Sequence, residues 1–218
     1  MPLIQKSFEI DPAMEHRRDR YASYSELREN EKEGLDYRVG LRYGRSGIAV
    51  MAPHGGNIEP GTSEIASVVA GEEHGFYELS GLRTSGNRDL HLKSTLFDEP
   101  RCLFIARQSQ KILTVHGCKG REEMVYLGGL CFLLKEEIER SLTMAGFTVG
   151  EYPGLQGKHP LNLCNLGSTG SGVQLELTSG LRRTMFENLT TDGRRNLTPI
   201  FDIFTTALRN ALLKRGSP

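Results

Sequence analysis

Arg45-Ser-Gly-Ile-Ala-Val-Met51, followed by Ala52-Pro-His-Gly-Gly-Asn-Ile-Glu-Pro-Gly-Thr-Ser-Glu64, is the stretch that decides the fold. The first part is short, apolar and ends before a proline, so it predicts a buried strand. The second part predicts a glycine-rich turn that bends the chain back until Glu59 faces His54. Thr62-Ser-Glu64 then precedes an apolar run and predicts a capped helix start. Open α/β sheets build sites in this way, at the carboxyl ends of their strands.

The composition indicates one globular domain without a charge bias. The chain has 218 residues and no internal repeat, so we expect a single domain in which residues 1–36 form an arm with an amphipathic helix and residues 37–218 form the core. Lysine plus arginine equals aspartate plus glutamate, with 27 of each, which argues against a nucleic-acid or membrane-surface binder. No secretion signal or membrane span is visible, so we expect a cytoplasmic monomer.

The four cysteines are widely spaced and form no C-x-x-C pair, and three of them lie in apolar segments. This pattern indicates free, buried thiols in place of disulfides or a zinc–thiolate site. They are Cys102, Cys118, Cys131 and Cys164.

The rest of the pattern predicts an α/β fold: an open, mixed, mostly parallel sheet with helices on both faces. Residues 36–43 alternate and predict a strand that pairs with the one leading into His54. A further strand is indicated around His91, where polar and apolar residues also alternate. Other strands are predicted over residues 75–79, 111–116, 124–129, 147–149 and 173–178, and helices over 21–30, 62–70, 130–146 and 191–215.

Lys111-Ile-Leu-Thr-Val-His-Gly-Cys-Lys-Gly120 repeats the pattern of an apolar strand followed by histidine and glycine. If the two strands are parallel neighbours, His54, Glu59 and His116 project at the same edge of the sheet. Two nitrogen ligands and one oxygen ligand, with a fourth position left for water, are the pattern of catalytic zinc. The alternative for His116 is a buried, hydrogen-bonded histidine.

Val173-Gln-Leu-Glu-Leu-Thr178 places Glu176 on the strand face opposite the apolar side chains. A carboxylate in a core strand costs stability unless it is paired or functional. Glu176 is therefore the candidate general base.

The middle of the chain is basic although the whole is neutral. From Gly81 to Arg121 there are eight basic and three acidic residues. This excess suits an anionic or carboxylate-bearing ligand, although a solvated surface would look the same. The candidate substrate-binding residues in this segment are Arg83, Arg88, His91 and Lys93.

From about Tyr21 to Arg183 the chain resembles the poly-γ-glutamate hydrolase family of bacteriophages and their bacterial hosts. The resemblance implies a zinc-carboxypeptidase-like fold, one zinc ion held by His54, Glu59 and His116, and Glu176 as the catalytic carboxylate. It also implies an anionic poly-γ-glutamate substrate and, for a phage-encoded protein, release by host lysis. The segments that carry it are Ala52-Pro-His-Gly-Gly-Asn-Ile-Glu-Pro-Gly-Thr-Ser-Glu64, Leu90-His-Leu-Lys-Ser-Thr-Leu-Phe-Asp-Glu-Pro100, Val115-His-Gly-Cys118, Asn162-Leu-Cys-Asn165 and Gly172-Val-Gln-Leu-Glu-Leu177.

One position departs from the family pattern. The family usually has arginine after the Asn165 position, where related metallocarboxypeptidases hold a substrate carboxylate, and this chain has Leu166. Loss of a forked guanidinium removes bidentate carboxylate recognition. Asn165 and Arg182 therefore complete the candidate substrate-binding set, with Arg182 among the basic residues that could compensate.

Metal-assisted amide hydrolysis is the expected chemistry. Two alternatives remain open from the sequence. One is hydrolysis of a small acylated amino acid or a peptide at the same site. The other is a module that binds metal or carboxylate without catalysis.

Overall fold

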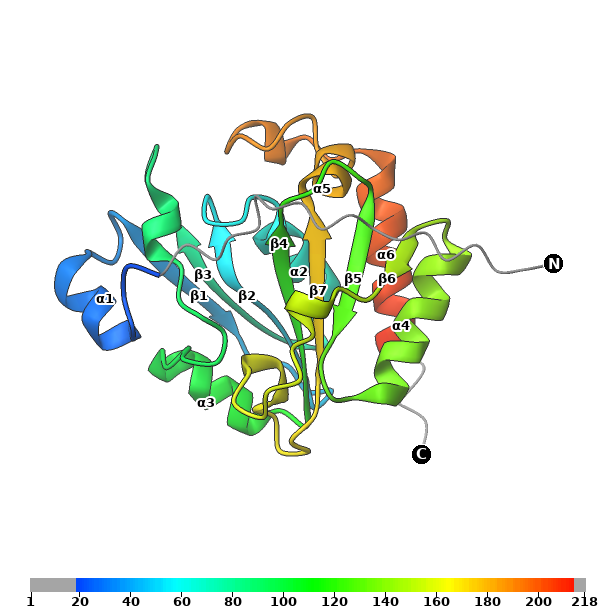
Figure 1. The fold of residues 1–218 in the computed structure, drawn as a ribbon, viewed down its shortest axis with the longest axis horizontal. Coiled ribbons are helices and arrows are strands. Elements are labelled where there is room, and N and C mark those ends of the chain that lie inside the picture. Colours follow the sequence, from blue (N-terminus) through cyan, green and yellow to red (C-terminus); the bar gives the residue numbers. More distant parts are fainter. Residues whose placement is uncertain (1–18, 214–218) are drawn as a thin grey trace.

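The computed structural model describes residues 19–213, in which seven strands form one sheet. The strands are β1 (Tyr37–Arg42), β2 (Ile48–Gly56), β3 (Gly75–Gly81), β4 (Lys111–Cys118), β5 (Met124–Gly128), β6 (Thr148–Gly150) and β7 (Val173–Thr178). They lie in the order β1-β3-β2-β4-β7-β5-β6 (Figure 1). The four central strands are parallel, and β1 on one side and β5 and β6 on the other run against them. The predicted mixed, mostly parallel sheet is confirmed.

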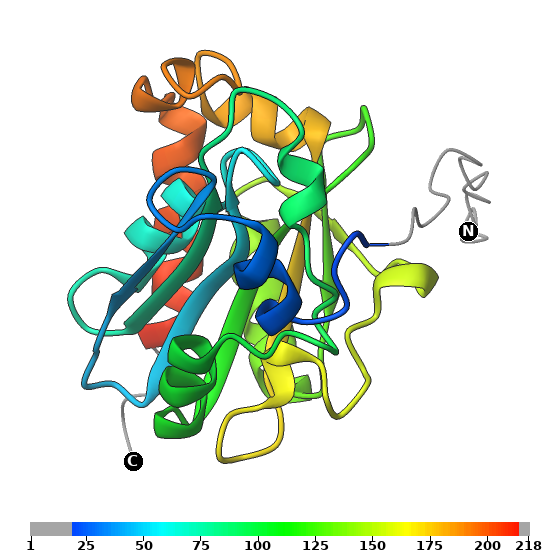
Figure 2. The ribbon, with the colours of Figure 1, turned by 90° about the vertical axis from the view of Figure 1, so that its left-hand side faces the viewer.

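Helices cover both faces of the sheet (Figures 1 and 2). They are α1 (Tyr24–Asn30), α2 (Thr62–Ala70), α3 (Pro100–Gln108), α4 (Phe132–Met144), α5 (Ser179–Met185) and α6 (Pro199–Leu213). Alternate residues of β2 enter two separate cores: Val50 packs in the core of α2, α4 and α6, and Met51 packs in the core of α1 and α3. Within residues 19–213, no helix has the length and apolar character needed to cross a lipid bilayer.

Short 3-10 helices lie in the connections: η2 (Asn87–Leu90), η3 (Pro153–Leu155), η4 (Leu163–Asn165) and η5 (Gly193–Arg195). The segment around His91 follows η2 as an irregular loop, so the predicted strand there is wrong. The alternation of polar and apolar residues arises because the side chains of Leu90 and Leu92 are both buried in the α1/α3 core, although the backbone there is irregular.

Two further predictions about β1 and α2 are corrected. β1 pairs with β3 and not with β2, because both edges of β2 are taken by β3 and β4. The α2 helix begins as predicted, but Gly61 is its N-cap and no side chain caps it.

At the carboxyl-terminal end, α6 begins only at Pro199, and the preceding helix α5 was not predicted. Residues 1–18 of the predicted arm and residues 214–215 of the predicted last helix lie outside the described residues. The division into an arm and a core thus stays a prediction. All four cysteines are free, as predicted; Cys118 is only partly buried, and the others are buried.

Candidate metal centre

The candidate site lies on the α1/α3 face of the sheet, at the carboxyl ends of β2, β4 and β7. On β7, Leu175 and Leu177 enter the opposite core, which leaves Glu176 on the site face, as the alternation predicted. The Cα atom of Glu176 is the register partner of the Cα atom of His116 on β4. Both side chains are buried, so two adjacent strands present a histidine and a carboxyl side by side.

His54 reaches the same face because of an irregularity in β2. The sequence placed His54 in a turn after the strand, whereas β2 continues to Gly56, so that prediction is corrected. The register shifts between Ala52 and Gly55, around Pro53, which has no N–H to give to the sheet. A bulge of this kind redirects side chains, and it brings His54 Nδ1 to 3.1 Å from His116 Nδ1.

Glu59 lies in the turn after β2, and its carboxylate points back to the two histidines. Its backbone N–H donates to the carbonyl oxygen of His54, which closes the turn. Oε1 lies 3.1 Å from His54 Nδ1, and Oε2 lies 3.8 Å from His116 Nδ1. The N–H of Gly117 donates to Oε2 at 2.8 Å and fixes the carboxylate. The structure therefore brings His54, Glu59 and His116 together, as the sequence suggested.

These three groups fit a zinc ion. Ligands about 2.0–2.1 Å from a tetrahedral zinc lie roughly 3.3–3.4 Å from one another, close to the separations found here. His54 Nε2 lies 2.7 Å from the carbonyl oxygen of Leu92, which only accepts, so the proton is on Nε2 and the Nδ1 lone pair faces the cluster. Within the part of the chain that the structure describes, the buried Nε2 of His116 has no hydrogen-bond partner. Within that part of the chain, His116 thus lacks the outer partner that metal-binding histidines usually have.

His91 joins the cluster, although the sequence suggested a substrate contact. Its ring stacks on His54, with centroids 3.9 Å apart, and its Nε2 lies 3.8 Å from Glu59 Oε1. His54, Glu59 and His91 each offer a ligand atom within 4.8 Å of the others. On its other side, His91 Nδ1 lies 2.7 Å from Asp19 Oδ1. Nothing in the sequence pointed to Asp19, which is 72 residues away in the chain.

A polar network orients Glu176. Gln174 Nε2 donates to Glu176 Oε1 at 3.0 Å, and Gln174 Oε1 accepts from Asn162 at 3.0 Å. The sequence offered a signal for Gln174 that we did not use, because it lies two residues before Glu176 on the same strand face. Among residues 19–213, no basic side chain hydrogen-bonds to Glu176.

The two carboxyl groups are shifted in opposite directions. Burial opposes ionisation of Glu59, but the charges that His54, His116 and His91 carry when they are protonated outweigh it and hold the pKa of this carboxyl well below its usual range. Burial, and then the charge of Glu59, raise the pKa of Glu176 well above its usual value. Burial also lowers the pKa of His91 to about 4 and that of His116 to about 3. Neutral imidazoles beside an ionised carboxylate are ready to bind a cation.

The predicted basic residues lie around this cluster with different partners. Arg83 is bound by Glu31 and Asp36 and is thus tied to α1 and β1. Arg88 is about half exposed, and Lys93 is exposed. Of these three, Arg88 and Lys93 present charge to solvent where an anionic ligand could meet it.

Asn165 and Arg182 are buried, and their side chains form hydrogen bonds with backbone groups. The Asn165 amide donates to two loop carbonyl oxygens, and its side-chain oxygen accepts from two backbone N–H groups. The Arg182 guanidinium donates to the carbonyl oxygens of Pro60, Cys118 and Leu177. These contacts give both residues a structural task, and their binding of substrate stays a prediction.

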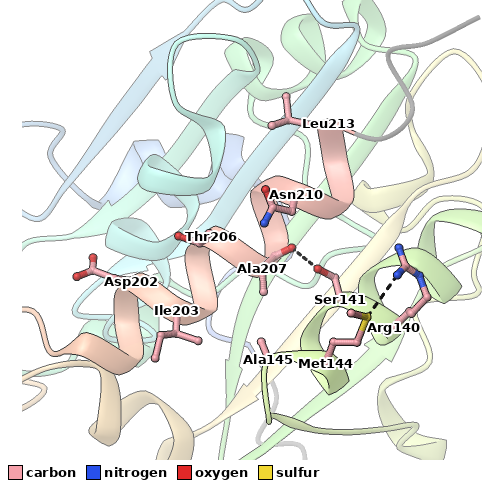
Figure 3. Close-up of a pocket in the computed structure, with 10 residues that line it drawn as sticks. All are labelled: Arg140, Ser141, Met144, Ala145, Asp202, Ile203, Thr206, Ala207, Asn210 and Leu213. Atoms are coloured by element: carbon pink, nitrogen blue, oxygen red, sulfur yellow. Dashed lines mark hydrogen bonds between the residues drawn. The ribbon is translucent and has the colours of Figure 1, made fainter.

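A separate groove of about 710 Å³ lies between α4 and α6 (Figure 3). It is lined by residues such as Met144, Ile203 and Leu213, and Ser141 spans it by donating to the carbonyl oxygen of Ala207. None of the candidate site residues lines it, so it is distinct from the histidine cluster.

A mostly parallel sheet with two histidines and two carboxyl groups at its carboxyl edge defines the class: an open α/β domain with a polar site at the strand ends. The chain belongs to the poly-gamma-glutamate hydrolase family, whose model matches residues 21–207. The family resemblance found in the sequence is thereby confirmed.

Similar proteins include YoqZ, derived from the SPbeta prophage of Bacillus subtilis (strain 168), which is 35% identical over 179 residues. That match covers 81% of this chain, and the chain spans 65% of the length of YoqZ. The structure of a bacteriophage poly-gamma-glutamate hydrolase is 29% identical, with a TM-score of 0.88 over 90% of this chain and 98% of the other. A zinc-free apo structure of YndL is 31% identical, with a TM-score of 0.86 over 92% of this chain and 100% of the other.

Proposed function

We propose that this chain is a zinc-dependent hydrolase that cleaves γ-glutamyl amide bonds of poly-γ-glutamate. The observation that carries the proposal is the convergence of His54, Glu59 and His116 beside the buried carboxyl of Glu176, in a chain of this family. The phage hydrolase and the zinc-free form of YndL support the substrate and the metal by similarity.

In this proposal His54, Glu59 and His116 hold one zinc ion. When bound there, zinc supplies a Lewis acid that polarises the amide carbonyl and lowers the pKa of water toward about 7. Glu176 accepts a proton from the attacking water while the carbon–oxygen bond forms. The same carboxyl then donates that proton to the amide nitrogen as the carbon–nitrogen bond breaks. Burial raises the pKa of Glu176 in the metal-free protein, and the charge of a bound zinc ion would favour the ionised form that accepts the proton.

Substrate carboxylates are recognised, in this proposal, by exposed basic side chains. Each γ-linked unit carries a free α-carboxylate. Arg88 lies in η2, and Lys93 lies in the loop after it, which also carries His91 and the carbonyl of Leu92. Asn165 and Arg182 act indirectly. Arg182 holds the backbone near the carboxyl ends of β4 and β7, Asn165 holds the loop backbone that precedes β7, and Leu166 supplies no charge.

The proposal is tested by the size distribution of poly-γ-glutamate after incubation with the purified protein. We expect shortening that stops when a chelator removes metal and returns when zinc is added. Glu176→Gln should bind zinc and leave the polymer intact, whereas Arg140→Gln, in the groove between α4 and α6, should behave as the wild type.

Two other outcomes would reject the proposal in favour of the alternatives. Zinc binding with cleavage of small acylated amino acids, and an intact polymer, would indicate the small-substrate hydrolase. Zinc binding without turnover of either substrate would indicate a binding module.

A further inference from the structure

Asp19 is the acidic side chain that hydrogen-bonds to the ring of His91 on the side away from Glu59. Its Oδ1 lies 2.7 Å from His91 Nδ1 and 3.1 Å from Arg88 Nη1. The side chains of Asp19 and His91 are 16% and 18% exposed, so the contact is largely shielded from water. Because a carboxylate accepts, Nδ1 of His91 carries the proton, and the lone pair of the neutral ring is on Nε2.

That lone pair belongs to the atom nearest the cluster. His91 Nε2 lies 3.8 Å from Glu59 Oε1, the same separation that joins His116 Nδ1 to Glu59 Oε2. The ring is held parallel to His54 by stacking, with an angle of 26° between the planes. Both position and orientation therefore suit a nitrogen donor to a cation beside Glu59.

The outer contacts of the three histidines support this role. Histidines that bind metals usually donate their other N–H to a carbonyl or a carboxylate. His54 donates its Nε2–H to the carbonyl oxygen of Leu92, and His91 donates its Nδ1–H to the carboxylate of Asp19. His116 has no such partner among the described residues. By this criterion His91 resembles a ligand more closely than His116 does.

We propose that Asp19 is a positioning residue that fixes His91 so that Nε2 becomes a further nitrogen donor to the cation. The proposal rests on the proposed function for the presence of zinc, but it does not depend on the substrate. Three histidines and Glu59 would then surround the ion, and water or substrate would enter as a fifth ligand, a coordination number that catalytic zinc sites reach. It also explains why Asp19, which is 72 residues from His91 in the chain, lies at this edge of the sheet.

The test measures metal binding without substrate. Zinc dissociation constants are obtained by competition with a chromophoric chelator, and the visible absorption spectrum of the cobalt-substituted protein reports the donor set. We expect Asp19→Asn to weaken zinc binding about 10- to 100-fold, the usual effect of losing such an outer partner. His91→Gln should weaken it at least as much and change the cobalt spectrum.

Asp89→Asn is the matched control, because Asp89 is a carboxylate in the same region that pairs with Arg20 at 2.9 Å. It should leave both readouts unchanged, and thermal unfolding confirms that each variant is folded. If His91→Gln leaves the dissociation constant and the cobalt spectrum at their wild-type values, or the wild type binds no zinc, the inference is overturned. If the variants lose zinc as expected but the wild type leaves the polymer intact, only the proposed function fails.

Discussion

Replacement of Glu176 by glutamine separates catalysis from folding at this site. The two side chains have nearly the same shape, and the Gln174 amide that donates to Glu176 Oε1 can donate equally to an amide oxygen. The buried network therefore survives the change. In the proposed mechanism, the change removes the ability to accept a proton from water and return it to the leaving nitrogen.

The expected loss of turnover follows from the role of a general base. Such groups contribute on the order of 10²–10⁴-fold to the rate, which corresponds to about 3–5 kcal/mol of transition-state stabilisation. We expect kcat for poly-γ-glutamate cleavage to fall by this factor with little change in KM, since Glu176 makes no predicted contact with substrate carboxylates. The zinc content should stay at the wild-type level.

Stability should change in the opposite direction to activity. The pKa of Glu176 is raised in the folded protein, so the native state binds more protons than the unfolded state, and stability falls as pH rises above the unfolded value of about 4.3. Glutamine removes this penalty. In metal-free protein, Glu176→Gln should therefore melt at or above the wild-type temperature at pH 8, with the advantage disappearing near pH 4.

The assay combines initial rates of polymer shortening with thermal unfolding across this pH range. Glu78→Gln is the control, because Glu78 is also a buried strand carboxylate, but it pairs with Arg38 at 3.1 Å outside the cluster. It should retain activity within a few-fold. Near-normal turnover of Glu176→Gln with bound zinc would refute the assignment of Glu176 as the base.

Three further predictions concern stability and replace no residue of the histidine cluster. Arg182→Met should lower the free energy of unfolding by about 3 kcal/mol, since buried carbonyl oxygens lose their donors, and urea titration measures it. Leu208→Ala in α6 should cost about 2–5 kcal/mol by opening a cavity, with kcat unchanged when polymer cleavage is assayed well below the melting temperature. Burial lowers the pKa of His74 below its usual 6.5, so the folded state resists its protonation and stability should fall as pH drops below 6.5. His74→Gln should reduce this acid sensitivity in melting experiments between pH 5 and pH 8.

Local patterns predicted the parts of the site that lie on regular strands. Apolar runs in the sequence predicted β4 and β7. The alternation of apolar and polar residues in β7 predicted that Glu176 lies on the face away from the core of α2, α4 and α6. Because β2 and β4 are parallel neighbours, their carboxyl ends lie at the same edge of the sheet. The proximity of His54 and His116 could therefore be predicted.

The errors occurred where tertiary contacts decided the outcome. Nothing local revealed that β2 runs through His54 with a register shift, because the bulge is defined by its pairing with β3. The partner of β1 depended on which strand edges were free. Asp19 gave no signal because its contact with His91 joins residues that no periodicity connects.

The two carboxyl groups at this sheet edge acquire different properties from their surroundings alone. Glu59 accepts a hydrogen bond from the backbone of Gly117 and lies among imidazoles, so its charge is stabilised and it suits a permanent ligand. Glu176 is buried between strands, and in the part of the chain that the structure describes the Gln174 amide is its one hydrogen-bond donor, so its charge is disfavoured and it suits proton transfer. Pairs of titratable groups whose environments separate their pKa values are typical of acid–base catalysis. The division of labour follows from which strand end each carboxyl occupies, so the fold itself supports assigning the base to Glu176 and a ligand role to Glu59.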